Sequence, residues 1–368
     1  MFIPFEVIAK WPTPNNVSPE THNPVMVVII IFLMICVTVL MGIRLYTRQV
    51  ISNGAGLDDV LILLAFIPAI AFAIIGVIGV LNLGWDRHVW DVRPALITAS
   101  LQLSLVVQIL FDIATSLTKL SMLALIYRVV RAGLSTMRYF IVFFACIVGL
   151  NCLLFVFITL FQCSPISDYW KVSLTPQKCL NQASHLLAAS IINTITDFMT
   201  VFLPIKTVLG LHLPKRQRLI ICLLFSGGIV ASIAGAVRTY FSWLCASTPD
   251  HDTTWMAYYV TLTSSVELFL GIICASLPAT KPFFSRYGPR LIGLSTGSQA
   301  AEPLAAEAGK SSSDTDFTVT VRHHDAAWLL PEKSAQSPNP VSPMSAPDLN
   351  KPLPQIRTGA PRPFSWEV

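Results

Sequence analysis

Five charged side chains lie inside stretches that are otherwise strongly apolar, and they are the residues of this chain best placed to carry chemistry. They are Asp112, Lys119, Asp197, Arg238 and Glu267. An ionised side chain at the centre of a bilayer costs roughly 2.5–3.5 kcal/mol on insertion scales, so we expect such residues to be retained for a purpose. Asp112 and Lys119 are seven residues apart, two turns along one helix face and too far for a direct pair. Each therefore needs a partner on another helix or contact with water.

We predict two ion pairs in this intramembrane charged core, Arg238 with Glu267 and Lys119 with Asp197. Two interpretations of the core stay open. In one, the core binds a ligand or switches between two pairings. In the other, static ion pairs fix how the helices pack.

The elements that position these residues are long apolar segments. The chain is 54% hydrophobic and only 12% charged, whereas soluble domains carry roughly 25% charged residues. A helix needs about 20 mainly apolar residues to cross a bilayer. Seven stretches qualify, at about 25–43, 60–83, 95–127, 139–161, 185–205, 219–244 and 256–277. The sequence therefore predicts an all-α integral membrane protein, a seven-transmembrane-helix bundle over residues 25–284.

The distribution of Lys and Arg predicts the orientation of this bundle. Basic residues gather after the first, third, fifth and seventh helices, and the loop between the sixth and seventh helices has none. Cytoplasmic loops carry such an excess, so we place the short N-terminus, residues 1–24, on the extracellular or luminal side. Residues 285–368 are rich in Ser, Pro and Ala without a periodic pattern. Such a segment cannot offset its ordering entropy by burying apolar surface, which predicts a disordered cytoplasmic tail.

Two features belong to the predicted outer side. Cys163 and Cys179 lie in the loop between the fourth and fifth helices, where the oxidising side favours a disulfide that pins the loop over the bundle. The alternative is two free thiols. Asn16 opens an N-glycosylation sequence, Asn-Val-Ser, and is the glycosylation candidate. The following Pro19 and the nearby membrane both disfavour its occupancy.

Two further patterns have structural interpretations. Gly227, Ala231 and Gly235 recur every four residues and form a small-residue surface that allows close helix approach, which we assign to packing inside the bundle. Asp58 and Asp59 precede the predicted second helix. We read them as acids that cap exposed N–H groups and suit the helix dipole.

Several chemistries lack their signatures in this sequence. The predicted last helix, 256–277, contains no Lys for a retinal Schiff base. We find no HExxH, GxSxG or Walker motif, so we expect no enzyme activity, no cofactor and no metal site. The net charge of +5 is explained by Lys and Arg beside membrane segments, so we expect no nucleic-acid partner.

Several local patterns taken together resemble one family. They are LDDVLILLAF, LGWDRHVWDV, LTKLSMLALIYRV, FQCSPISDYW with a later KCL, INTITDFMTVFLPIKTVLGLHLPKRQR, SGGIVASIAGAVRTY and DTTWMAYYVTLTSSVELFLGIICASLPATKP. Their order and spacing over about 57–282 resemble the fungal rhodopsin-domain family, seven-helix membrane proteins of filamentous fungi with receptor-like and biosynthetic-cluster members. Matching positions include Lys119, Asp197, Arg238 and Glu267, which implies that the charged core is a family feature. The chain departs from the receptor-like subgroup in lacking a Cys-rich extracellular domain.

Two functions from different classes remain open. The first is a receptor-like sensor without retinal, which takes an unknown small-molecule ligand outside and recruits a cytoplasmic signalling protein through its basic loops and tail. The alternative is a transporter or accessory membrane protein of a secondary-metabolite pathway, in which the three acids of the core carry protons. In both, the lipid bilayer surrounds the protein, and the resemblance implies the plasma membrane rather than an internal one.

Overall fold

The computed structural model describes residues 5–15, 17–22, 24–52, 54–129, 135–171, 173, 177–209, 215–247 and 252–291. All of these lie in the first of two compact units, residues 1–298. The described residues are dominated by helices and include no named strand, only two isolated β-bridges. The predicted all-α fold is confirmed.

Seven helices among the described residues are long and apolar enough to cross a membrane, as predicted. Each begins within a few residues of its predicted start. They are α2 (Val25–Tyr46), α3 (Leu57–Leu83), α4 (Pro94–Val129), α5 (Ser135–Leu160), α6 (Gln182–Leu209), α7 (Lys215–Ser247) and α8 (Thr253–Leu291). Short elements accompany them: the helix α1 (Phe5–Ile8), the π-helical turn η1 (Thr47–Ile51) and the 3-10 turns η2 (Val89–Asp91) and η3 (Ile166–Tyr169).

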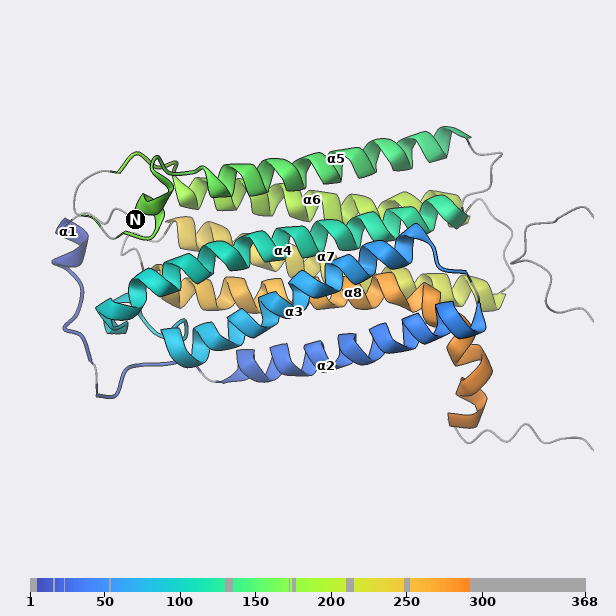
Figure 1. Cartoon of the computed structure of the whole chain (residues 1–368), viewed down its shortest axis with the longest axis horizontal. Helices are drawn as coiled ribbons and strands as arrows, with labels where there is room; N and C mark the ends of the chain where they lie inside the picture. Colours follow the sequence, from blue (N-terminus) through green and yellow to red (C-terminus); the bar gives the residue numbers. More distant parts are fainter. Residues whose placement is uncertain are drawn as a thin grey trace, which may run out of the picture. The chain divides into compact units, whose positions relative to one another are not determined.

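The seven long helices lie side by side in one bundle, with α4 at its centre (Figure 1). Helix α4 packs against α3, α5, α6 and α8, and α8 packs also against α2 and α7. We call the end that carries the loop 161–181 the disulfide end, and the opposite end, where α2 turns into α3, the basic end. Because α4 touches four neighbours, its charged side chains can reach most of the bundle.

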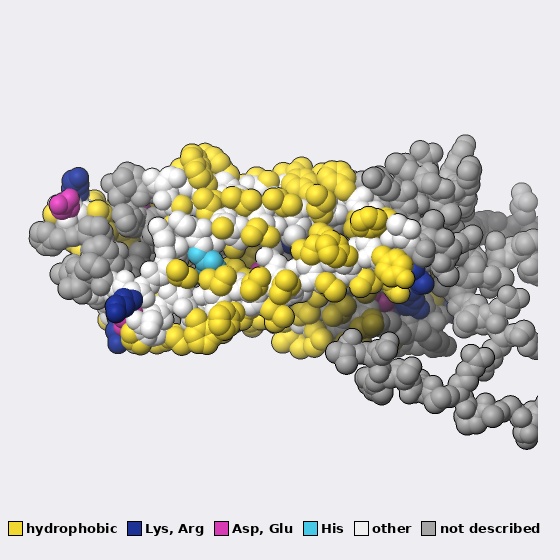
Figure 2. All heavy atoms as spheres, turned by 90° about the horizontal axis from the view of Figure 1, so that it is seen from above, with side chains coloured by type: hydrophobic (Ala, Val, Ile, Leu, Met, Phe, Trp, Pro, Cys, Tyr) yellow, Lys and Arg dark blue, Asp and Glu magenta, His cyan; other side chains and the backbone are white. Residues whose placement is uncertain are grey.

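The surface between the two ends suits lipid. Figure 2 shows mainly hydrophobic side chains along the bundle, with the charged side chains gathered toward its ends. Helix α5 exposes Phe143, Leu150, Leu153 and Phe157. In a bilayer such side chains face acyl chains, while the helices satisfy their own backbone polar groups.

The last helix differs from the prediction. Helix α8 continues to Leu291, past the predicted end at 277 and seven residues into the segment predicted as tail. The prediction followed apolarity, which fades at Lys281, but Phe283 and Tyr287 continue the helix by packing on Tyr46 of α2. Figure 1 shows the end of α8 turning away from the bundle axis. Pro278 and Pro282 explain the bend, since proline removes an amide donor and crowds the preceding turn.

Residues 292–368 lie outside the described residues. The predicted orientation, with residues 1–24 outside, stays a prediction.

Candidate functional site

Four of the five predicted core charges form two ion pairs between helices. Lys119 of α4 lies 3.0 Å from Asp197 of α6, measured from Nζ to Oδ1. Arg238 of α7 lies 2.7 Å from Glu267 of α8, measured from Nε to Oε2. These are the two pairings that the sequence predicted. All four side chains are at least four-fifths buried.

A neutral residue, Asn193 of α6, joins the two pairs. Its Nδ2 donates to Glu267 Oε1 at 2.6 Å and to Asp197 Oδ2 at 3.2 Å. Its Oδ1 accepts from Lys119 Nζ at 2.8 Å. We call Lys119, Asn193, Asp197, Arg238 and Glu267 the central network. It is one continuous set of polar contacts across α4, α6, α7 and α8.

Sequence reasoning missed Asn193, although a signal was present. Ser190, Asn193 and Asp197 are spaced three and four residues apart, which places them on one face of α6. Ser190 Oγ accepts from Arg238 Nη1 at 2.8 Å. A polar stripe beside a membrane acid therefore marked the partners of the network.

The guanidinium of Arg238 also contacts α4. It lies over the ring of Phe111, 4.9 Å from the ring centroid, a cation–π contact that a dry core strengthens. Its Nη2 is buried and has no hydrogen-bond partner. The Nη2 group of Arg238 can therefore donate to a further acceptor.

The fifth predicted residue, Asp112, lies apart from the network. Its carboxyl is hydrogen-bonded by the Cys152 thiol of α5, and its Oδ2 is buried without a hydrogen-bond partner. The expected partner on another helix therefore exists, but it is a thiol and not a cation.

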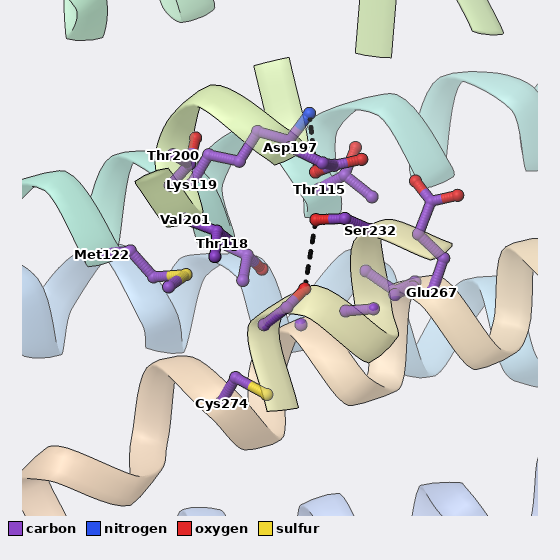
Figure 3. A pocket seen from close by; sticks show the side chains of 14 residues that line it. Thr115, Thr118, Lys119, Met122, Asp197, Thr200, Val201, Ser232, Glu267 and Cys274 are labelled. Atoms are coloured by element: carbon purple, nitrogen blue, oxygen red, sulfur yellow. Dashed lines mark hydrogen bonds and ion pairs between the residues drawn. The ribbon is translucent and has the colours of Figure 1, made fainter. Parts of the chain in front are cut away.

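A small cavity of about 40 Å³ borders the central network (Figure 3). In that view the Lys119 amine and the Asp197 carboxylate face one another on one side of the cavity, while Glu267 lies beside it. The wall is completed by Thr115, Thr118, Met122, Thr200, Val201, Gly228, Ala231, Ser232, Leu268, Gly271 and Cys274. This volume holds about two or three water molecules, so it suits water that relays between side chains and not a metabolite.

The small residues of α7 allow this helix to approach the carboxylates. A Cβ at Gly235 would lie 3.1 Å from Glu267 Oε2 and 3.3 Å from Asp197 Oδ2. A Cβ at Gly227 would lie 2.7 Å from Cys274 Sγ of α8. The small-residue surface thus serves packing inside the bundle.

A second buried charge group lies at the basic end, and it adds ion pairs to the capping role that the sequence predicted there. We call Arg44, Arg48, Asp58 and Asp59 the basic-end cluster. Asp59 does accept from the Gly56 N–H at 3.0 Å, as a capping acid does. Both acids, however, also pair with Arg44 and Arg48 at 2.8–3.3 Å. Arg44 is 1% exposed and lies inside α2, which continues past the predicted helix end at 43.

The disulfide end carries the predicted bridge, since Cys163 and Cys179 form a disulfide. The loop that it closes packs on the bundle through Tyr169, whose hydroxyl accepts from Gln182 Nε2 at 2.9 Å. Burial raises the pKa of Tyr169. The described part of the loop is therefore held against the bundle, as predicted.

Five stacked rings connect three segments at the disulfide end. They were not predicted from the sequence. The ring stack consists of Trp90, His88, Trp255, His22 and Tyr258, with successive centroids 4.6, 4.0, 3.6 and 4.2 Å apart. It joins the N-terminal segment and the α3–α4 loop to the start of α8. The glycosylation candidate Asn16, close by in the sequence, lies outside the described residues.

Comparison with known proteins places this architecture in a family. The fungal rhodopsin domain matches residues 43–286, which is most of the bundle and well over half of the chain. The chain is 24% identical to Receptor GIN3 of Arthrobotrys oligospora over 312 residues, 82% of this chain and 72% of that protein. No solved structure gives a significant match.

Two other relatives match over shorter stretches. A SAT4 family membrane protein of Emericella nidulans is 28% identical over 207 residues, 55% of this chain and 51% of the relative. Wortmanamides biosynthesis cluster protein C of Talaromyces wortmannii is 24% identical over 219 residues, 60% of this chain and 51% of the relative. The chain thus spans about half the length of these two relatives. Given seven apolar helices and the extent of the family match, this chain is a multi-pass membrane protein that belongs to the fungal rhodopsin-domain family.

Proposed function

We propose that the protein is a receptor-like membrane sensor that works without retinal and has no catalytic role. The observation that carries this proposal is the central network, in which each acid is paired with one cation and Asn193 connects the two pairs inside an apolar bundle. A ligand that changes one contact shifts the balance among the others, and a sensor needs such an element with two arrangements. The similarity to Receptor GIN3 over most of the chain supports the same function.

Helix α4 gives the network a route to the basic end. It carries Lys119 in the network, and two residues later Ser121 donates to the Asp58 backbone oxygen at 2.7 Å. At its end, the half-exposed Arg128 lies 3.6 Å from Asp58 Oδ1. A shift of α4 would therefore move groups that a partner protein can reach.

With residues 1–24 outside, the disulfide end would meet a small-molecule ligand and the basic end a cytoplasmic signalling protein. In this proposal the plasma membrane is the site of action, and nucleic acid is not a partner.

The test is capture of the intact protein from its native membrane, with G-protein subunits as the readout. We expect a subunit to co-purify with the wild type and its recovery to change at least several-fold with Glu267→Gln, which removes the charge that holds Arg238. Lys171→Gln is the matched control because Lys171 is exposed in the loop 161–181. Equal recovery from both variants, each present at wild-type level, would reject the proposal.

The alternative, a transporter or accessory protein of a secondary-metabolite pathway, has one specific support. The relative from Talaromyces wortmannii is named for a biosynthesis cluster. Proton-coupled uptake by the same protein in vesicles tests it directly. Flux that Glu267→Gln abolishes, without recovery of a signalling subunit, would replace the sensor with a transporter.

A further inference from the structure

The charges of the membrane core do not balance. Among the described residues between the two ends of the bundle, the acids are Asp112, Asp197 and Glu267, and the cations are Lys119 and Arg238. The two ion pairs use both cations and two of the acids. Asp112 is left without a counter-charge of its own.

The surroundings of Asp112 suit a neutral acid better than a carboxylate. Its side chain is buried, with the residue 7% exposed. The charged and titratable groups that act on it are the Cys152 thiol of α5, Lys119 on its own helix and Arg238 of α7. Both cations are engaged by their own acids. An ionised group with an unpartnered oxygen costs several kcal/mol in such a place, whereas a neutral acid costs far less.

A bound metal cation would balance the charge less well than a proton. Hard cations need about six oxygen ligands. Among the described residues, no group of three or more His, Cys, Asp or Glu side chains is placed to hold a metal ion. Cys152 contributes sulfur, and the residues that line the cavity do not include Asp112. A proton needs only the carboxyl itself.

We propose that Asp112 is a proton-binding site, held as a neutral carboxylic acid while Arg238 pairs with Glu267. When the proton leaves to water, the core gains one negative charge at Asp112. Arg238 is the natural responder, because its unpartnered Nη2 can donate to a new acceptor and its guanidinium already lies over Phe111, next to Asp112 in the chain. This inference does not rest on the proposed sensor function, because it follows from charge and burial alone.

Infrared spectroscopy of the full-length purified protein in lipid nanodiscs tests the site. At mildly acidic pH we expect a carbonyl-stretch band of a protonated carboxylic acid that Asp112→Asn removes. Asp168→Asn, a control in the loop 161–181, should leave the band in place. A spectrum without the band, or a band that persists in Asp112→Asn, would overturn the proposal.

A second measurement covers the case in which a variant folds poorly. Asp112→Asn replaces a neutral acid with a neutral amide, so its melting temperature should stay within a few degrees of the wild type. Asp197→Asn and Glu267→Gln strip Lys119 and Arg238 of their counter-charges and should lower it much further. Equal losses in all three variants would show that Asp112 is ionised and would reject the proton site.

Discussion

The central network and the basic-end cluster contain the same chemistry but link it differently. In the basic-end cluster, Asp58 and Asp59 each contact both Arg44 and Arg48. In the central network each acid has one cation, and Asn193 carries the connection between the pairs. An acid that contacts two cations keeps one when the other is lost, whereas an acid with one cation is left without a counter-charge. The first arrangement therefore suits a clamp and the second suits a rearrangement.

Charge balance separates the two regions further. At the basic end, Arg44 and Arg48 pair with two aspartates, and Arg128 adds a further positive charge 3.6 Å from Asp58. Arg44 Nη1 also donates to the Ala275 backbone oxygen of α8 at 2.8 Å. The central region has one more acid than cations, and a small cavity borders it. Buried atoms without a hydrogen-bond partner occur in both regions, on Asp112 and Arg238 in the core and on Arg48 at the basic end, where Nε still lies 3.3 Å from Asp59. At Asp112 and Arg238 a second arrangement can form new hydrogen bonds without breaking existing ones, which lowers its cost.

The largest effect should come from breaking the clamp with Arg44→Met. This change leaves the buried carboxylates of Asp58 and Asp59 to share Arg48 and removes the donor to the Ala275 oxygen. We expect a loss of about 3–5 kcal/mol, the range seen when one partner of a buried pair is removed. Thermal unfolding of the purified protein in detergent measures it.

Arg48→Met is the matched control for the clamp. Its side chain is 13% exposed, so water can partly replace it and the loss should be clearly smaller. Equal losses for the two arginines would show that the clamp is not centred on Arg44.

The next effect concerns the ion pair between Arg238 and Glu267 in the central network. In a double-mutant cycle of Arg238→Met and Glu267→Gln, each single change should destabilise the protein, and the double variant should lose less than the sum. Gln keeps an acceptor for Asn193, so the cycle isolates the ion pair. We expect an interaction energy of about 1–3 kcal/mol from unfolding in detergent. Additive losses would mean that the pair contributes no coupling.

A smaller effect should follow from crowding the network with Gly235→Ala. The new methyl group would lie against the carboxylates of Glu267 and Asp197, and such overpacking costs about 1–3 kcal/mol. Gly149→Ala on α5 is the control, since no atom lies within 4 Å of the position that its new methyl group would take. There, the better helix propensity of Ala should make the change neutral or stabilising. Equal unfolding temperatures for the two variants would contradict close approach of α7.

The sequence was sufficient for what carries a large energetic signature. Apolar length predicted the seven helices, and the cost of charge in lipid singled out Lys119, Asp197, Arg238 and Glu267, for which opposite charges were the available partners. Asn193 was not predicted because a neutral amide does not carry the cost of an ionised side chain in lipid. The contact from Arg44 to the Ala275 oxygen spans 231 residues and uses a backbone group, which every residue possesses. A backbone acceptor of this kind cannot be identified from residue types.

The smallest predicted effect lies outside both charge regions, in the ring stack, and it sharpens the contrast between them. His22 is packed between Trp255 and Tyr258, and its backbone N–H donates to the Asp86 backbone oxygen at 2.8 Å. Burial lowers the pKa of His22, although Asp86 and Asp252 oppose the shift and His88 adds to it. When the N-terminal segment leaves the bundle, His22 returns to its ordinary pKa of about 6.5. The detached segment therefore binds more protons than the segment docked on the ring stack.

Docking of the N-terminal segment should consequently be strongest above about pH 6.5 and weaken as the pH falls through the lowered pKa of His22. Hydrogen exchange of residues 17–22 across this range measures it, and His22→Phe should keep the stacking but abolish the pH dependence. A response that persists in His22→Phe would show that His22 is not the titrating group. Asp112→Asn should leave this response unchanged, because a proton at the disulfide end acts on one docked segment. A proton in the core acts instead on a charge balance that four helices share.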